Sequence, residues 1–167
     1  ASAQFNLGAL YRVGNGVPRD LAEALRWFRK AAEGGDLRAE SDLGTVYFYG
    51  DGVPKNLEEA LKWYQKASER GNAIAQFNLG YMYHNGEGVP KDLAATVQLY
   101  TKAAEQGLAT AQAELAYLYL QGQGVPKDAA RAAQWYLKAA PQGVAQAQFE
   151  LGNLYFDGTG VPKNLSR

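Results

Sequence analysis

The sequence predicts an all-α fold, a right-handed α-solenoid of antiparallel helix pairs with a 36-residue repeat. A Gly-Val-Pro triplet begins at residues 16, 52, 88, 124 and 160, so each copy follows the last by 36 positions. Two apolar landmarks keep the same step, namely Leu7, Leu43, Leu79, Leu115 and Leu151, and Tyr11, Tyr47, Tyr83, Tyr119 and Tyr155. Such regular spacing defines a tandem array whose units bury their apolar faces by stacking. We expect a single repeat domain over residues 1–167, with units 1–36, 37–72, 73–108 and 109–144 and a partial unit 145–167.

The first helix of each unit is predicted from apolar residues at helical spacing. In the first unit, residues such as Ala3 and Leu7 fall on one face of a helix over about residues 3–13. Gly14 can adopt the left-handed conformation that ends a helix. Pro18 holds the preceding residue extended, so the first helix cannot run into the second.

The second helix of each unit is predicted to begin at an Asp or Asn whose side chain caps its first turn. These N-cap residues are Asp20, Asn56, Asp92, Asp128 and Asn164. Glu23 and Glu59 stand where they would complete capping boxes. Pro141 is expected to end the second helix of the fourth unit early, because proline removes a helical hydrogen bond. Small residues at one position of the first helix are expected to allow close helix approach: Gly8, Gly44, Gly80, Ala116 and Gly152.

Composition and charge exclude several classes of function. Lys and Arg number 17 and Asp and Glu number 17, and this zero net charge disfavours a dedicated binder of nucleic acid or of anionic membranes. With no cysteine and 1 histidine, disulfides, thiolate metal sites and multi-histidine metal centres are excluded. We therefore expect no cofactor and no metal. No run approaches the roughly 18 consecutive apolar residues of a membrane span, and a chain that begins in mid-pattern without methionine is typical of a fragment or processed form.

Three motifs follow one another along the repeat. They are Leu-Gly-x-x-Tyr, then Gly-x-Gly-Val-Pro with Lys or Arg next, then Trp or Leu followed by Tyr or Phe before x-Lys-Ala, with clear copies at residues 75–80, 85–92 and 63–67. This pattern resembles the Sel1-like repeat, a relative of the tetratricopeptide repeat, over essentially the whole chain. The resemblance implies an α-solenoid adaptor of signalling, protein quality control or bacterial envelope and host-interaction pathways, in the bacterial periplasm or cytoplasm. Since members of the family differ mainly in what they bind, the fold does not identify the partner.

The candidate binding surface is the variable face, the side of the first helices opposite their shared apolar positions. A merely solvated helix face is rich in Lys, Glu and Gln, whereas this one carries aromatic side chains with polar ones between them, which are typical of binding hot spots. By analogy with tetratricopeptide arrays, the variable face lines the concave surface. The predicted peptide-binding residues are Arg12, Thr45, Phe48, Tyr49, Tyr81, His84, Asn85, Tyr117, Leu120, Gln121, Asn153 and Phe156. The alternative is that neighbouring first helices bury these rings against each other, and Phe5, Phe77 and Phe149 fit that alternative equally well.

The leading hypothesis is a non-catalytic scaffold that binds a protein or peptide segment with apolar anchors, without nucleic-acid binding or membrane insertion. A second hypothesis is a carbohydrate or peptidoglycan module in which the tyrosines stack on sugars. The resemblance to cysteine-rich relatives also implies an enzyme that handles β-lactams, but this is a weaker alternative because no serine is followed by lysine three residues later. His84 is a lone histidine and is expected to make a polar contact. The chain ends also leave open end-to-end self-association.

Overall fold

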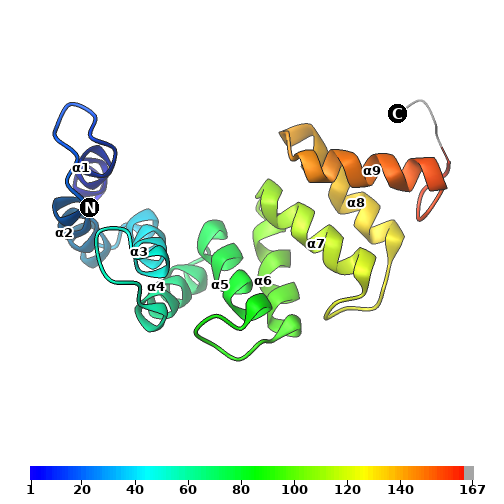
Figure 1. Cartoon of the computed structure of the whole chain (residues 1–167), viewed down its shortest axis with the longest axis horizontal. Helices are drawn as coiled ribbons and strands as arrows, with labels where there is room; N and C mark the ends of the chain where they lie inside the picture. Colours follow the sequence, from blue (N-terminus) through cyan, green and yellow to red (C-terminus); the bar gives the residue numbers. More distant parts are fainter. Residues whose placement is uncertain (164–167) are drawn as a thin grey trace. The chain divides into compact units, whose positions relative to one another are not determined.

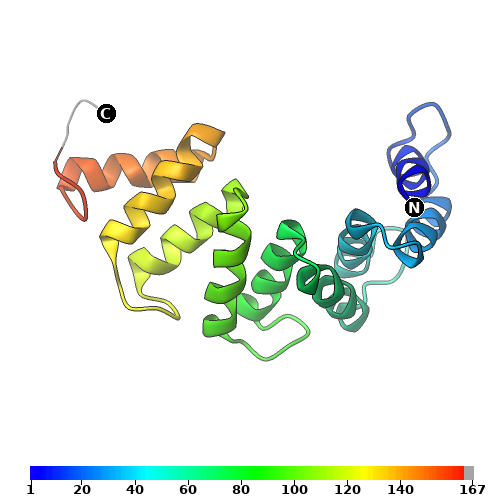
Figure 2. The ribbon, with the colours of Figure 1, turned by 180° about the vertical axis from the view of Figure 1, so that it is seen from behind.

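The chain is all-helical in a computed structural model that describes residues 1–163. Over these residues it forms nine α-helices and one 3-10 helix and no strand (Figure 1, and from behind in Figure 2). The helices are α1 Ser2–Val13, α2 Leu21–Glu33, α3 Leu37–Tyr49, α4 Leu57–Glu69, α5 Ala73–Asn85, α6 Leu93–Glu105, α7 Ala109–Gln121, α8 Ala129–Ala139, η1 Ala140–Gln142 and α9 Ala145–Asp157.

The chain divides into two compact units, Ala1–Met82 and Tyr83–Arg167, and the boundary falls inside α5. Each unit has an apolar core of its own. The single repeat domain expected from the sequence stays a prediction.

The core of the first unit is shared by consecutive helix pairs. Helix α1 packs on α2, α2 on α3 and α3 on α4. Phe28 of α2 and Leu43 of α3 are fully buried, and the half-buried rings of Phe5 and Trp63 pack against the same cluster. Because helices of different repeats contribute to one cluster, neighbouring repeats stabilise each other.

The second unit repeats this packing, with α6 on α7, α7 on α8 and α8 on α9. Its core cluster contains Tyr136 of α8, Ala116 of α7 and Leu154 of α9. Helix α8 ends at Ala139 and continues as η1, which contains Pro141. The early end predicted from this proline is therefore confirmed.

The loop inside each helix pair is held by a backbone hydrogen bond that was not predicted from the sequence. The predicted side-chain caps are confirmed at Asp20, Asn56, Asp92 and Asp128, while Asn164 lies outside the described residues. The backbone N–H of Asp20 donates to the carbonyl oxygen of Tyr11 at 2.9 Å, and the Asn56 N–H donates to the equivalent Tyr47 at 2.8 Å. The same bond recurs in the next two pairs.

This backbone bond overturns the capping boxes predicted at Glu23 and Glu59. A capping box needs the N-cap N–H as the donor to the glutamate, but that N–H is already used by the tyrosine carbonyl. The two carboxylates instead pair within their own helices, Glu23 with Arg26 at 3.1 Å and Glu59 with Lys62 at 3.2 Å.

Candidate functional site

The predicted contact residues of the first unit form an aromatic cluster at the end of α3. Phe48 is 7% exposed, whereas Tyr49 and Tyr81 are 73% and 41% exposed. The Phe48 ring makes edge-on contacts with Tyr49 at 5.0 Å and with Tyr81 at 6.1 Å between ring centroids. Aromatic pairs favour this geometry. Tyr49 and Tyr81 therefore make the accessible surface of the cluster, and Phe48 supports them from inside.

Thr45 is half-buried and takes part in the packing of α3 on α4. Its hydroxyl donates to the carbonyl oxygen of Ser41 at 3.2 Å and accepts from the Tyr64 hydroxyl at 3.1 Å. Burial raises the pKa of Tyr64 to about 12, against the opposing effect of the hydrogen bonds with Thr45 and Asn78. The Tyr64 hydroxyl is therefore a neutral donor whose hydrogen bonds are made inside the protein.

Arg12 occupies a site made by three helices of the first unit. Its Nη1 donates to Asp42 Oδ2 at 3.1 Å, and its guanidinium carbon lies 5.4 Å from the centroid of the Phe28 ring. Burial raises the pKa of Asp42, and the attraction of Arg12 lowers it in part. The guanidinium is thus held between an aromatic face and a half-buried carboxylate, the two kinds of partner that it binds best.

The predicted contact residues of the second unit differ in exposure. Phe156 at the end of α9 is 63% exposed, and Lys163 Nζ lies 5.6 Å from its ring centroid. Tyr117 is half-buried, and Leu120 is half-buried against the core of this unit. The exposed polar members of the set are Asn85, Gln121 and Asn153.

His84 is half-buried at the end of α5. Its Nδ1 is buried without a hydrogen-bond partner among residues 1–163. Burial lowers the pKa of His84, and the positive charge of Lys91 lowers it further. The imidazole is therefore neutral at pH 7.

A polar group absent from the predicted set lies beneath the variable face of the second unit. Tyr136 has no exposed surface, and its hydroxyl has no hydrogen-bond partner among the described residues. Burial raises the pKa of Tyr136, and the negative charges of Glu150 and Glu114 raise it further. Tyr136 is the repeat equivalent of Tyr64, so the repeat could have indicated its position, though not that its hydroxyl is unpaired.

Neither of these two glutamates is paired with a cation among residues 1–163. Burial raises the pKa of Glu114, and no other group is a cause of that shift. Within residues 1–163, neither Glu114 nor Glu150 makes an ion pair or hydrogen bond through its carboxylate. The buried phenol thus lies near two carboxylates that have no cationic partner in the described part of the chain.

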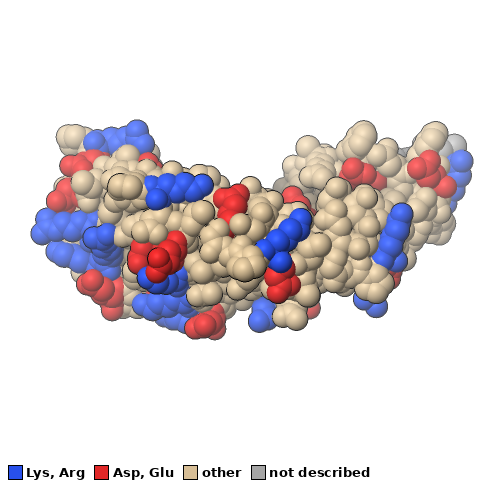
Figure 3. All heavy atoms as spheres, turned by 60° about the horizontal axis from the view of Figure 1, so that its bottom comes forward, with Lys and Arg blue, Asp and Glu red and all other residues tan. Residues whose placement is uncertain are grey.

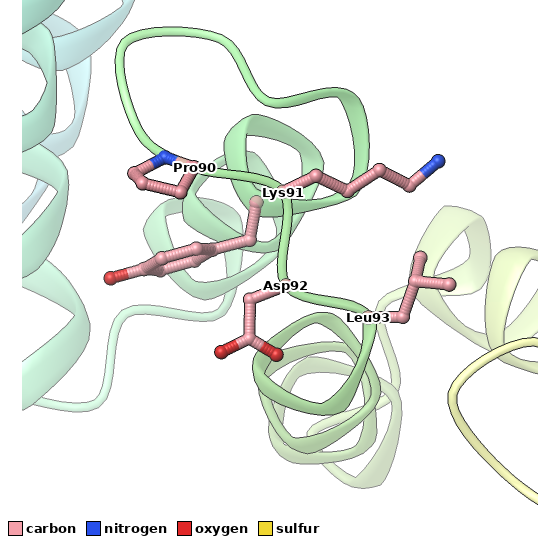
Figure 4. A pocket seen from close by; sticks show the side chains of 5 residues that line it. Pro90, Lys91, Asp92 and Leu93 are labelled. Carbon is pink, nitrogen blue, oxygen red and sulfur yellow. The ribbon is translucent and has the colours of Figure 1, made fainter.

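Shallow depressions accompany the loops of the second unit. One, of about 680 Å³, is lined by Tyr83, Pro90, Lys91, Asp92 and Leu93. Figure 4 shows the Asp92 side chain directed towards the start of α6, where it accepts from the Ala95 N–H at 2.9 Å. A second depression, of about 190 Å³, lies at the next loop, and its lining includes the equivalents of four of these residues, Tyr119, Pro126, Lys127 and Asp128. Since the depression recurs with the loop, it belongs to the repeat scaffold.

Charged side chains of both signs lie on the face of the molecule that Figure 3 shows. On the face in Figure 3, basic and acidic side chains are interspersed with uncharged surface. Among residues 1–163 there is no group of three or more His, Asp or Glu side chains that could hold a metal ion. No helix in the described part of the chain is long and apolar enough to cross a membrane.

Several solved structures share this fold. A protective antigen present in uropathogenic Escherichia coli strains, which displays an SLR fold, is 38% identical with a TM-score of 0.93, and the match covers 99% of this chain and 35% of that one. A Sel1 repeat protein from Oxalobacter formigenes is 38% identical with a TM-score of 0.92, over 98% of this chain and 66% of that one. An immunity protein from Pseudomonas aeruginosa is 28% identical with a TM-score of 0.65, over 93% of this chain and 58% of that one. This chain therefore spans less than two thirds of each relative.

The family assignment rests on the repeats themselves. No curated protein gives a significant match. The Sel1 repeat matches residues 1–36, 37–72, 73–108, 109–144 and 145–167. The all-helical structure and its solenoid relatives confirm the predicted fold class, an α-solenoid with a 36-residue repeat. The chain belongs to the Sel1 repeat family.

Proposed function

We propose that this chain is a non-catalytic scaffold that binds a protein or peptide segment on the variable face of its first helices. Sel1 repeat proteins are generally protein-interaction scaffolds, and one similar structure is that of an immunity protein. The observation that carries the proposal is the exposure of Tyr49 and Tyr81 around the buried Phe48 ring. Exposed aromatic clusters of this kind are typical of binding hot spots.

Packing alone does not account for these tyrosines. A ring that stays 73% exposed, as Tyr49 does, gains little hydrophobic stabilisation from folding. Its contact with Phe48 nevertheless fixes the ring position, so a ligand would lose little conformational entropy in ordering it. Apolar side chains of an extended or helical peptide would bury both rings, which favours binding at this end of α3.

A selection experiment with random peptides tests the proposal. Displayed peptides are selected against the wild-type chain, and each enriched peptide is measured against the Y49A/Y81A variant. Leu10→Ala is a matched control, since Leu10 is 39% exposed and lies outside the variable face. We expect the double variant to bind the enriched peptides at least about tenfold more weakly, which is about 1.4 kcal/mol, and the control to bind them like wild type.

The variants must keep their fold for this comparison to count. Exposed substitutions usually change stability by no more than about 0.5 kcal/mol, so urea unfolding of Y49A/Y81A should stay near that of wild type. The proposal is wrong if no peptide is enriched over an unrelated helical repeat protein, or if the enriched peptides bind the double variant as tightly as wild type.

A further inference from the structure

The first unit contains an arginine site that the chain fills by itself. Arg12 comes from α1, its stacking partner Phe28 from α2 and its carboxylate partner Asp42 from α3. The Nη1–Oδ2 distance is 3.1 Å, and the guanidinium carbon lies 5.4 Å from the ring centroid. We call these three residues the internal arginine site. It demonstrates that this repeat geometry can hold a guanidinium between a ring of one repeat and a carboxylate of the next.

The same three repeat positions occur in the second unit, three repeats further along the chain. They are occupied by Leu120 of α7, Tyr136 of α8 and Glu150 of α9. The aromatic ring and the carboxylate are therefore kept, while leucine replaces the arginine. This second copy has the partners of a guanidinium, but the position equivalent to Arg12 carries none.

The environment of Tyr136 differs from that of its equivalent in the first unit. The Tyr64 hydroxyl donates to Thr45 at 3.1 Å, but the residue equivalent to Thr45 beside Tyr136 is Tyr117. The Tyr136 hydroxyl is left buried and unpaired among the described residues. A buried hydroxyl without a partner costs folding free energy, which a ligand that supplies the missing hydrogen bond recovers.

The negative charges near this hydroxyl favour a cationic ligand. Glu150 and Glu114 both act electrostatically on Tyr136, and neither is paired with a cation in the described part of the chain. Two unpaired carboxylates repel an anion. An apolar ligand would remove water from the carboxylates without replacing its hydrogen bonds, which costs free energy. A cation with several N–H donors can satisfy both carboxylates, and the phenol oxygen can accept a further hydrogen bond from it.

We propose that Glu114, Tyr136 and Glu150 form a binding site for an arginine side chain of the protein partner. The site rests on the proposed scaffold function and adds a charged anchor to the apolar ones. Both glutamates are partly exposed, so a guanidinium reaches their carboxylates from solvent. The Tyr136 hydroxyl is buried, so side chains around it must move before the guanidinium donates to it. Arginine fits better than lysine, because its planar group carries several N–H donors in a rigid fork that matches carboxylates.

The site is tested with Nα-acetyl-arginine amide as the probe, titrated into isotope-labelled protein and followed by NMR. We expect saturable shifts at the amides of Glu114 and Glu150 and at the Tyr136 ring, weaker binding of Nα-acetyl-lysine amide and none of Nα-acetyl-glutamine amide. The E114Q/E150Q variant should bind the arginine probe at least about tenfold more weakly. Absence of saturable shifts at these residues, or unchanged affinity in the double variant, would overturn the proposal.

A second variant copies the internal arginine site. Leu120→Arg places a guanidinium at the position that corresponds to Arg12, so it should fill the site and exclude the probe. Leu120 also packs on the core, so its thermal unfolding is measured, and E114Q/E150Q decides the result if L120R does not fold. A folded L120R that still binds the probe like wild type contradicts the proposed position of the guanidinium.

The two proposals can fail separately. Enriched peptides that depend on Tyr49 and Tyr81, together with a silent arginine titration, would overturn the arginine site and leave the scaffold function. Saturable binding of the arginine probe with no enriched peptide would overturn the scaffold function and leave the arginine site.

Discussion

Arg12 on α1 and Asp42 on α3 form an ion pair of 3.1 Å that links the first two repeats through their side chains. The pair is partly shielded from water, because Arg12 lies over the Phe28 ring and burial raises the pKa of Asp42. The contribution of such a pair is measured by removing one partner, because the remaining buried charge then has no counter-ion and destabilises the fold.

Removal of the cation should destabilise the first unit in a pH-dependent way. We expect Arg12→Leu to lower the free energy of unfolding at pH 7 by about 1 kcal/mol, because the ionised Asp42 carboxylate is left half-buried without its arginine. Asp42 already has a raised pKa in the folded state, so ionisation opposes folding. As the pH falls through that pKa, Asp42 becomes neutral and the difference from wild type should vanish. Urea unfolding between pH 7 and pH 4 measures this.

The Asp42→Asn background provides the control for that experiment. If loss of the ion pair causes the destabilisation, Arg12→Leu should lower the free energy of unfolding much less when residue 42 is already uncharged. A loss of the same size at every pH, in both backgrounds, would assign the effect to the packing of Arg12 on Phe28 instead.

Glu114→Gln should stabilise the second unit at pH 7. Burial raises the pKa of Glu114 and no cation among residues 1–163 pairs with it, so the ionised form is disfavoured in the folded state. We expect a gain on the order of 0.5 kcal/mol, which shrinks as the pH falls and wild-type Glu114 takes up its proton. Glu105→Gln is the control, because Glu105 is exposed on α6. Equal stability changes for both variants in urea unfolding at pH 7 would refute this explanation.

The architecture of the repeat could be predicted from the sequence because local chemistry determines it. Glycine ends the first helix, proline separates the two helices and Asp or Asn caps the second, and each of these effects depends on neighbouring residues alone. The capping boxes at Glu23 and Glu59 were wrong for a non-local reason. The carbonyl oxygen of Tyr11, which precedes the loop, accepts the Asp20 N–H that the box requires.

The candidate site was less predictable because burial depends on the next repeat. Phe48 and Tyr49 are adjacent on the variable face and look equivalent in the sequence. The structure buries Phe48 between Tyr64 and Tyr81, which lie on two other helices, and leaves Tyr49 exposed. The unpaired hydroxyl of Tyr136 likewise depends on distances that no periodicity specifies.

The second glycine of each loop offers a test of contacts between repeats. Gly124 has φ +70, and a Cβ there would lie 2.5 Å from the Leu93 carbonyl oxygen of the preceding repeat, whereas Gly16 has φ +76 and no atom within 4 Å. Gly16→Ala should therefore cost only the left-handed backbone penalty of about 1–2 kcal/mol. Gly124→Ala should lower the free energy of unfolding clearly more, because the new methyl group must also push the Leu93 carbonyl of the preceding repeat away. Equal losses in urea unfolding would mean that the contact with Leu93 contributes nothing.

Gly44 and Gly152 occupy the same repeat position on first helices but have different surroundings. A Cβ on Gly44 would lie 2.4 Å from Cδ1 of Tyr64, a buried ring, whereas a Cβ on Gly152 would meet nothing within 4 Å. Gly44→Ala should therefore destabilise the first unit by about 1–3 kcal/mol through overpacking. Gly152→Ala should stabilise α9 by up to about 1 kcal/mol, since alanine favours a helix interior over glycine. Thermal and urea unfolding of the two variants give the signs directly, and a stabilised Gly44→Ala would show that α3 and α4 can move apart without loss.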